Sequence, residues 1–210
     1  MQIILHASAS EISAADWSNL DHHNDPFTSG AFLTIAEKIG AADTALGWQA
    51  QHLALYDETA PDGEQLLGLL PLYLRTHSFG DFSHDWHWAA AWQNAGLAYY
   101  PKLVTGVPFT PSPGPRLLVR TGVARALIVQ ALIHAAIDLA KTQQISSWQC
   151  LFVEETDCEA LKAAGLLIRR GVQFHWINRN YAHFDDFLVG FTADKRKKLK
   201  RERRAVQESG

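Results

Sequence analysis

The sequence predicts a mixed α/β fold in which a central sheet is flanked by helices. Segments with a two-residue apolar period alternate along the chain with segments of helical period, and this alternation is typical of such folds. With 210 residues, 47% of them hydrophobic, the chain can bury a large core without disulfides or metals. Its two cysteines, Cys150 and Cys158, fit neither a disulfide framework nor a zinc site, so a reducing cytoplasm is the simplest compartment.

The N-terminal half predicts strands and helices in turn. The first residues lack the cationic region of a secretory signal and look like a strand. A helix is expected over residues 10–20, and a second one begins after Ser29, a good cap, and ends at Gly40. Two strands at 52–56 and 65–74 flank a turn with Pro, Asp and Gly. An aromatic segment, residues 76–98, then runs into a short helix.

The C-terminal half continues the alternation. Strands are expected at 103–107, 117–119, 147–153 and 172–177, and helices at 123–141, at 156–165 and from 181 onward. The long helix contains the stretch nearest to a membrane span, residues 124–140. Gln130, His134 and Asp138 recur there every four residues, which predicts one solvated face and an amphipathic helix that packs on the core.

Residues 99–116 hold five of the eight prolines of the chain. Each proline fixes its own φ and biases the preceding residue towards extended backbone, so the segment should be stiff. It could form one wall of a cleft for an anionic ligand, with Lys102 and Arg116 as isolated cations at fixed places. The alternative is an edge strand that leads into a Pro-rich turn, and the pattern alone favours it.

The charge of the chain is unevenly distributed. Residues 195–204 hold eight Lys or Arg and a single acid, which leaves 11 of the 19 bases and 21 of the 22 acids to the rest of the chain. Such a block predicts an anionic partner, although a solvated charged helix is the usual explanation.

Several enzyme signatures are missing from the sequence: GxSxG, the Walker A loop, GxGxxG and HExxH. Acyl transfer to an amine leaves fainter traces, because it needs only a polarising donor, a route for the amine proton and a slot for both substrates. Residues 119–124 lie where GNAT acetyltransferases hold the coenzyme A pyrophosphate, and Gly122 and Ala124 match the loop of that family. Val119 does not match it, and an ordinary strand-to-helix loop explains the residues equally well.

The aromatic segment contains His84 and His87, a pair that could ligate a metal with Asp85 and His77 nearby. We predict no metal, because such pairs are more often incidental on a loop. The neighbouring tryptophans fit a core or a subdomain seam better than a platform for bases. They are Trp86, Trp88 and Trp92.

Longer matches extend over nearly the whole chain. They comprise Pro26-Phe27 with residues 31–33, residues 71–74 with 77–80, Asp85-Trp86 with Trp88, residues 99–102 with 108–111 and 114–116, residues 173–176, Asn178, Tyr181, Phe184, Phe187-Leu188, and Arg196-Lys197 with 201–203. On these residues the chain resembles the FemAB-like family of N-acyltransferases, which is associated with peptidoglycan biosynthesis or recognition.

The resemblance implies a GNAT-like fold in which two such units border the substrate cleft. The chain would hold the first unit over residues 1–170 and a truncated opening of the second over 171–210, and this fragment could be inactive alone. Fem enzymes move an aminoacyl group from tRNA to a peptide amine of a cell-wall precursor. The expected reaction is therefore N-acyl transfer, with aminoacyl-tRNA or an acyl-CoA as donor and an anionic or cell-wall precursor as acceptor.

The candidate residues follow from the resemblance and from the charges. The catalytic candidates are Asp85, Tyr99, Tyr100 and His175; the substrate-binding candidates are Lys102, Phe109, Thr110, Arg116, Trp86, Lys195, Arg196, Lys197, Arg201 and Arg203; and Gly122 with Ala124 are the candidates for binding a cofactor. Two alternatives stay open. The same cleft could recognise a cell-wall fragment without catalysis, or the basic block could dock on a membrane or a nucleic acid without specificity.

Overall fold

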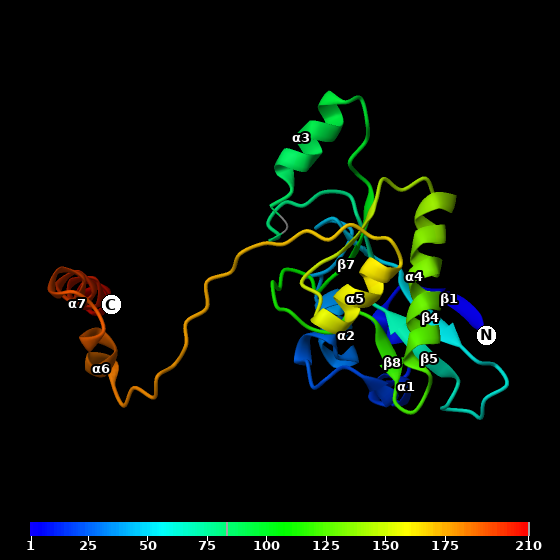
Figure 1. The fold of residues 1–210 in the computed structure, drawn as a ribbon, viewed down its shortest axis with the longest axis horizontal. Coiled ribbons are helices and arrows are strands. Elements are labelled where there is room, and N and C mark those ends of the chain that lie inside the picture. The colour runs from blue at the N-terminus through cyan, green and yellow to red at the C-terminus, as the bar shows by residue number, and fades with distance from the viewer. Residues whose placement is uncertain (83, 210) are drawn as a thin grey trace. The chain divides into compact units, whose positions relative to one another are not determined.

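The computed structural model describes residues 1–82 and 84–209 and divides the chain into two units, Met1–Ile168 and Arg169–Gly210. The first unit carries two sheets, with strand orders β1-β4-β5-β8-β2 and β3-β6-β7-β9. The strands are β1 (Gln2–His6), β2 (Leu20–Asp21), β3 (Trp48–Ala50), β4 (His52–Tyr56), β5 (Leu66–Leu70), β6 (Tyr73–Arg75), β7 (Lys102–Thr105), β8 (Leu118–Arg120) and β9 (Trp148–Cys150). The predicted class, mixed α/β with a central sheet flanked by helices, is confirmed (Figure 1).

The two sheets share continuous strands. The pairs Trp48 with Arg75 and Leu53 with Leu70 keep one register from β3 into β4 and from β6 back into β5. Between them the backbone N–H of Gln51 donates to Leu72 O at 2.8 Å, so the ladder is not broken. The predicted strand at 65–74 is therefore real but is interrupted around Pro71, which has no N–H to donate.

The third strand of this ladder is interrupted by the Pro-rich segment. Lys102 pairs with Arg75 and Val104 with Tyr73, and the ladder resumes only where Leu118 pairs with Leu69. Residues 106–117 thus leave the sheet between β7 and β8. The parallel pairing of β7 with β9 shows the same gap, because it resumes at a single bridge between Gly114 and Val153. We call residues 106–117 the excursion.

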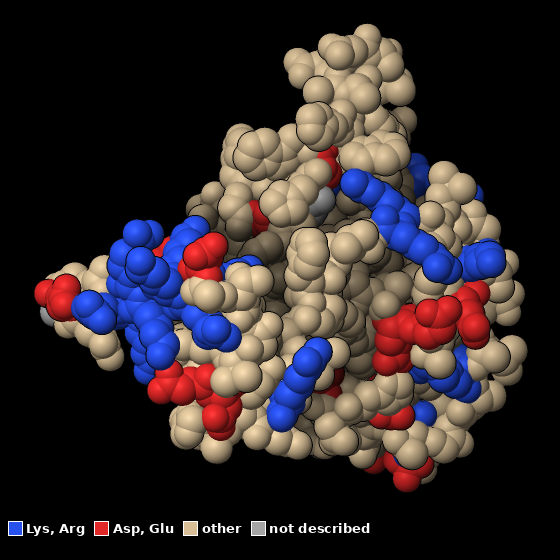
Figure 2. Space-filling model, turned by 60° about the vertical axis from the view of Figure 1, so that its left-hand side comes forward, with Lys and Arg blue, Asp and Glu red and all other residues tan. Residues whose placement is uncertain are grey.

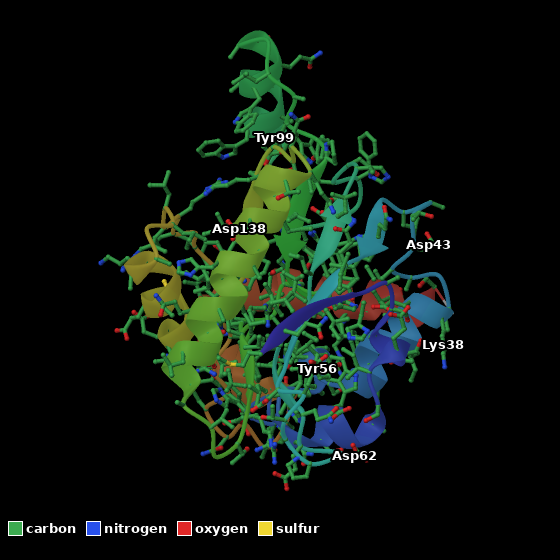
Figure 3. All side chains as sticks on the ribbon, turned by 90° about the vertical axis from the view of Figure 1, so that its right-hand side faces the viewer. Lys38, Asp43, Tyr56, Asp62, Tyr99 and Asp138 are labelled. Carbon is green, nitrogen blue, oxygen red and sulfur yellow. The ribbon has the colours of Figure 1, made fainter. Side chains whose placement is uncertain are left out.

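Helices cover both faces of the larger sheet. On one face lies α4 (Arg125–Thr142), which buries Leu132 and Ile133 against residues such as Leu53 and Leu70. On the other lie α1 (Ala14–Asn19) and α2 (Gly30–Lys38), where Trp17 and other apolar side chains meet Leu69 and Leu118. Figures 1 and 3 show α4 lying along the sheet. Truncation of a fully buried leucine in such a core costs about 2–5 kcal/mol.

Several local predictions hold. Ser29 is the N-cap of α2, and its side chain accepts a hydrogen bond from the backbone N–H of Phe32. Gly40, after the same helix, has φ +76°, a conformation that favours glycine. Gln130, His134 and Asp138 form the solvent-exposed side of α4. The described part of the chain contains no helix long and apolar enough to cross a membrane.

Other local predictions are wrong. The helix expected at 10–20 is split into η1 (Ala9–Glu11) and α1, each with its own serine cap, Ser8 and Ser13. The strand expected at 172–177 does not form: no strand is assigned there, and every residue from 171 to 180 is exposed. Alternating aromatics make a strand only where another strand pairs with the backbone and one face is buried, and the small second unit offers neither.

The remaining helices are short or exposed. In the first unit, α5 (Glu155–Ala163) follows β9, η2 (Pro26–Thr28) precedes α2, and α3 (Trp86–Asn94) projects from the body. None of the nine residues of α3 is buried, so the expectation that Trp86, Trp88 and Trp92 lie in the core is wrong, and their place at a subdomain seam stays a prediction. The second unit consists of α6 (Phe184–Val189), α7 (Ala193–Glu208) and the exposed chain before them.

Candidate functional site

One face of the smaller sheet carries an unusual set of polar side chains. Because side chains alternate along a strand, the register places Arg75, Lys102 and Gln149 on the face away from α4. Their neighbours Leu103 and Trp148 point to the opposite face and join the core under α4. Arg75 and Lys102 are 0% and 1% exposed. Buried cations require partners of opposite charge. Asp81 pairs with Arg75, and Asp85 pairs with Lys102.

Asp85 is the centre of a buried hydrogen-bond cluster. Its Oδ2 accepts hydrogen bonds from Ser78 Oγ at 3.1 Å, from Tyr99 OH at 3.0 Å and from Lys102 Nζ. The Gln149 amide joins Lys102 to Tyr99, because its Oε1 accepts from Lys102 Nζ at 3.1 Å and its Nε2 donates to Tyr99 OH at 3.0 Å. We call these residues, Asp85, Ser78, Tyr99, Lys102 and Gln149, the Asp85 cluster. Figure 3 shows Tyr99 at the base of the segment that carries α3.

Burial and charge act against each other in this cluster. Burial alone would raise the pKa of Asp85, but the hydrogen bond and the charge of Lys102 outweigh it and hold the pKa below the usual value. Burial lowers the pKa of Lys102 although Asp85 pulls it upward. Burial also raises the pKa of the Tyr99 phenol well above its usual value, and Asp85 adds to this effect. The hydrogen bond and charge of Lys102 therefore favour the carboxylate form of Asp85, and burial favours the neutral phenol of Tyr99.

The hydrogen-bonding capacity of the cluster is almost used up. Lys102 Nζ has three acceptors, namely Asp85, Gln149 and, at 3.4 Å, Tyr99 OH. Tyr99 donates its own proton to Asp85. The exception is Asp85 Oδ1, which is buried and accepts no hydrogen bond from any residue within 1–82 and 84–209. A buried carboxylate oxygen without a donor costs free energy, so a ligand N–H or O–H would gain by binding there.

A chain of hydroxyls connects this carboxylate to a partly exposed residue. Tyr100 OH donates to Ser78 Oγ at 2.8 Å, and Ser78 in turn donates to Asp85. Tyr100 is only partly buried, unlike Tyr99. The arrangement offers a path for a proton between the buried carboxylate and the surface.

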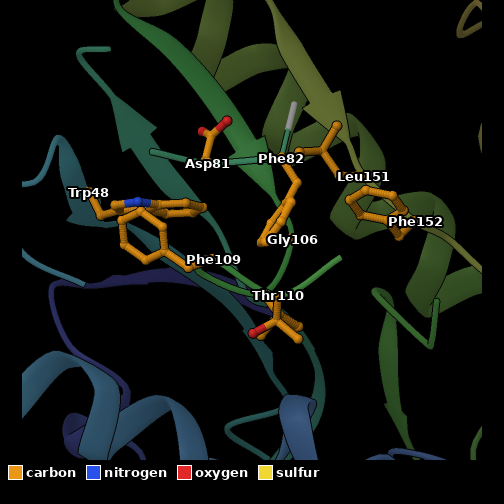
Figure 4. A pocket seen from close by; sticks show the side chains of 9 residues that line it. Trp48, Asp81, Phe82, Gly106, Phe109, Thr110, Leu151 and Phe152 are labelled. Carbon is orange, nitrogen blue, oxygen red and sulfur yellow. The ribbon is translucent and has the colours of Figure 1, made fainter. Parts of the chain in front are cut away.

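A small pocket opens beside the cluster, where the excursion leaves β7 (Figure 4). It is shallow and partly open to solvent, and its enclosed volume of about 20 Å³ leaves room for about one water molecule. The described residues that line it are Trp48, Asp81, Phe82, Gly106, Val107, Phe109, Thr110, Leu151 and Phe152. Apolar and aromatic groups dominate this set. Asp81 and Phe82 come from the same segment as Asp85, so the pocket and the Asp85 cluster share one wall.

An ion pair lies in the wall between pocket and sheet. Arg75 donates to Asp81 Oδ2 at 2.7 Å, and its guanidinium lies 3.7 Å from the centre of the Trp48 ring. Two further hydrogen bonds, to the carbonyls of Leu46 and Gly47, fix the guanidinium in place. The positive charge of Arg75 therefore sits directly behind the aromatic wall.

The excursion is held in shape from within by Arg116. Its guanidinium donates to the carbonyls of Ser112 at 2.6 Å, Pro115 at 3.0 Å and, through Nε, Leu151 at 3.0 Å, and it lies 3.9 Å from Asp25. The side chain is buried, and its donors are used inside the fold. Phe109, at the tip, has φ +53°, which is uncommon for a bulky residue and indicates local strain.

The other candidate residues lie elsewhere. Trp86 is on the exposed helix α3, and Phe109 and Thr110 line the pocket. Gly122, with φ +88°, and Ala124 form the loop between β8 and α4, and the Ala124 cap position makes no side-chain hydrogen bond. His175 lies in the exposed chain of the second unit. The structure brings together Asp85, Tyr99, Tyr100 and Lys102 and leaves the rest outside this cluster.

The basic candidates all lie on α7 of the second unit. Lys195, Arg196, Lys197, Arg201 and Arg203 belong to a helix without a buried residue. Figure 2 shows Lys and Arg side chains gathered densely where this helix lies. Some are engaged locally: Arg196 donates to Phe191 O at 3.0 Å, and Arg203 lies over the Phe184 ring. Among the described residues, no group of three or more His, Cys, Asp and Glu is arranged to hold a metal.

Sequence reasoning missed several residues of this region, among them Trp48, Arg75, Ser78 and Gln149. A weak signal existed for Arg75, because a cation within an apolar strand needs a buried partner. Gln149 gave no signal, since its role depends on the parallel pairing of β7 with β9 across more than forty residues.

These features define a mixed α/β protein with a buried carboxylate, amine and phenol cluster beside a small apolar pocket. The family described as FemAB-like, peptidoglycan biosynthesis/recognition, matches residues 8–210. The chain therefore belongs to the FemAB-like family, and its function falls, at the level of the family, within peptidoglycan biosynthesis or recognition. No curated protein matches the chain.

Two solved structures are similar to the chain. An aminoglycoside antibiotic 6'-N-acetyltransferase from Acinetobacter haemolyticus shares 15% identity over 86% of this chain and 100% of that one, with a TM-score of 0.45. An acetyltransferase from Trypanosoma brucei shares 11% identity over 84% of this chain and 100% of that one, with a TM-score of 0.39. At these values neither assigns a substrate to this chain.

Proposed function

We propose that this protein is an N-acyltransferase that passes an acyl or aminoacyl group to an amine, and that the acceptor amine binds at Asp85. The observation that carries the proposal is that Asp85 Oδ1 accepts no hydrogen bond from any described residue, whereas Oδ2 accepts three. An amine or ammonium is the complementary ligand, because it donates hydrogen bonds and complements a negative charge.

The low pKa of Asp85 gives it an orienting role. A carboxylate that holds its proton weakly is a poor base, but it positions an N–H group well. In the reaction the amine nitrogen forms a bond to the acyl carbon, the bond from that carbon to the leaving group breaks, and one amine proton departs. That proton goes to the leaving group, directly or through solvent, and the Ser78 and Tyr100 hydroxyls hold the carboxylate in place through their hydrogen bonds.

Access to Asp85 requires a local movement. Oδ1 is out of contact with solvent in this conformation. Asp85 occupies the residue before α3, and that helix buries none of its nine residues. A shift of α3 would open the oxygen to the acceptor while the hydrogen bonds of Asp85 to Ser78, Tyr99 and Lys102 stay in place.

The remaining candidates take supporting roles in this proposal. The basic residues of α7 in the second unit are proposed to bind an anionic group, such as a phosphate or tRNA. An acyl-CoA donor would place its pyrophosphate at the loop of Gly122 and Ala124, where α4 begins. His175 stays a prediction with no assigned step. The two free cysteines, Cys150 and Cys158, agree with action in the cytoplasm.

The test is a transfer assay with the full chain. Acyl-CoA and aminoacyl-tRNA donors are incubated with peptide amines of peptidoglycan precursors, and the products are identified by mass spectrometry. We expect an amide product, and we expect Asp85→Asn to reduce its rate at least ~100-fold. Asp138→Asn, on the exposed side of α4, is the matched control and should keep the rate.

Circular dichroism of Asp85→Asn checks that the fold is intact. Ser78→Ala is the second variant, since it removes one donor to Asp85 while leaving the ion pair with Lys102. Transfer that is unaffected in both variants would contradict the placement at Asp85.

A recognition module without catalysis is the second candidate. The observation in its favour is that Lys102 and Arg116 donate their hydrogen bonds to groups within the fold, as structural residues do. Binding of a precursor fragment with no amide product from any donor would establish this function instead.

A further inference from the structure

We infer that α3 and the loop after it dock on the surface of a lipid membrane without net charge, and that their tip enters the headgroup region. We call residues 86–98 the projection, because this part of the first unit stands out from its body (Figure 1). The inference concerns where the protein docks. It therefore goes beyond the proposed function and does not depend on acyl transfer.

The projection carries no formal charge. None of residues 86–101 is a Lys, Arg, Asp or Glu, although such residues make up 20% of the whole chain. Figure 2 shows the outer part of the projection without any Lys, Arg, Asp or Glu side chain. A helix that stands in water normally has a polar and charged face. The composition of the projection therefore indicates contact with uncharged surroundings.

The large apolar side chains of the projection are exposed. Trp86, Trp88 and Leu97 are 62%, 49% and 58% exposed. Phe79 and Phe82, in the segment before α3, are exposed as well. Scattered apolar residues on a surface need no explanation, but a group of this kind in one place marks an interaction site.

The distribution of these side chains fits a lipid surface better than a protein partner. An α-helix has 3.6 residues per turn, so Trp86 and Trp88 lie roughly 160° apart around α3. A protein that packs against one side of the helix would leave one of the two rings in water. A membrane surrounds an inserted projection on every side. Tryptophan is enriched at membrane–water interfaces, because its ring is apolar and its N–H is polar.

The backbone at the tip of the projection is already hydrogen-bonded. After α3, the N–H of Gly96 donates to Gln93 O at 3.0 Å, and the N–H of Leu97 donates to Trp92 O at 2.9 Å. Gly96 has φ +73°, as this type of helix end requires. Backbone groups that enter a membrane must be satisfied within the protein, and these bonds meet that need for two of the last carbonyls of the helix.

The length of α3 limits how far the projection can insert. Nine residues of helix span about 14 Å, whereas the hydrocarbon core of a bilayer is about 30 Å thick. The projection therefore enters one leaflet only. At its base, the Trp92 ring packs edge-on against Tyr99 with ring centres 5.7 Å apart. Because Asp85 immediately precedes α3, docking would bring the Asp85 cluster to the membrane surface.

The test measures binding of the full chain to vesicles of phosphatidylcholine, a lipid without net charge. Binding is followed by co-sedimentation at increasing lipid concentration. We expect the chain to bind, with an affinity that changes less than about twofold between about 0.05 and 0.5 M salt, because the projection has no charge to screen. Binding through the basic residues of α7 would instead require anionic lipid and would weaken with salt.

Two pairs of variants locate the binding. Trp86→Ala should weaken it at least ~5-fold, because a large apolar side chain no longer leaves water. Its matched control is Trp176→Ala, which removes a tryptophan that is 65% exposed in the second unit. Leu97→Asp places a charge at the tip and should abolish binding. Leu127→Asp, the same change at an exposed leucine of α4, should preserve it. Circular dichroism confirms that each variant is folded.

Three results would overturn the inference. The first is no binding to phosphatidylcholine vesicles, or binding only to anionic ones. The second is an equal loss in a variant and its control. The third is self-association that Leu97→Asp abolishes, without vesicle binding, which would make the projection a contact between two copies of the chain. Vesicle binding through the projection without any acyl transfer would leave the inference standing and contradict the proposed function alone.

Discussion

Replacement of Arg116 by methionine should destabilise the protein strongly. Methionine keeps much of the apolar stem but removes the guanidinium, which is 1% exposed. Three carbonyls, of Ser112, Pro115 and Leu151, lose their donor, and Asp25 loses the nearby charge.

The loss of stability follows from the buried carbonyls and the carboxylate that lose their partner. A hydrogen bond from a charged donor contributes about 1.5–3 kcal/mol, and removal of one partner from a buried ion pair costs about 3–5 kcal/mol. Such terms are not additive, so we expect the free energy of unfolding to fall by about 3–5 kcal/mol. For a chain of this size that is a fall in Tm of roughly 6–20 °C.

Urea denaturation followed by circular dichroism measures this difference. Lys162→Met, at an exposed position of α5, is the control and should change stability by less than about 0.5 kcal/mol. A loss below about 1 kcal/mol for Arg116→Met, together with weaker binding of an anionic ligand, would refute the reasoning. Arg116 would then be the ligand-binding cation that the sequence alone predicts.

Three further predictions concern other parts of the chain. The pKa of Asp85 is lower in the folded than in the unfolded chain, so its contribution to stability is complete above about pH 4 and is lost as pH falls below that value. The stability difference between the parent and Asp85→Asn, from urea titrations at several pH values, should therefore shrink below about pH 4, and a constant difference would count against the ion pair. Gly68→Ala should cost about 1–3 kcal/mol in thermal unfolding, because its Cβ would overlap the Ile128 side chain, and an unchanged Tm would show that α4 can move aside. Binding of tRNA to the full chain should weaken steeply with ionic strength and weaken further in Lys197→Glu, whereas a flat salt series would exclude α7 as its site.

Local features of the fold are predictable from the sequence because local interactions decide them. Ser29 caps α2 through a bond to a backbone N–H three residues away, and Gly40 follows the helix in a conformation that favours glycine. The strand expected at 172–177 fails for the opposite reason. Its alternating pattern is present, but a strand needs a partner, and no local property of the sequence supplies one.

The candidate site is predictable only in part, and Lys102 and Arg116 show where the limit lies. The sequence presents both as isolated cations on a stiff wall, yet the partner of Lys102 is Asp85, 17 residues earlier, and one carbonyl bound by Arg116 belongs to Leu151, 35 residues later. These distant partners change the roles of the two residues. One becomes part of a cluster in which Asp85 Oδ1 has no donor among the described residues, and the other shapes the loop that borders the pocket. The stiffness predicted from the prolines therefore acts on the shape of the loop, and the Lys and Arg side chains of α7, unlike Lys102 and Arg116, are not buried.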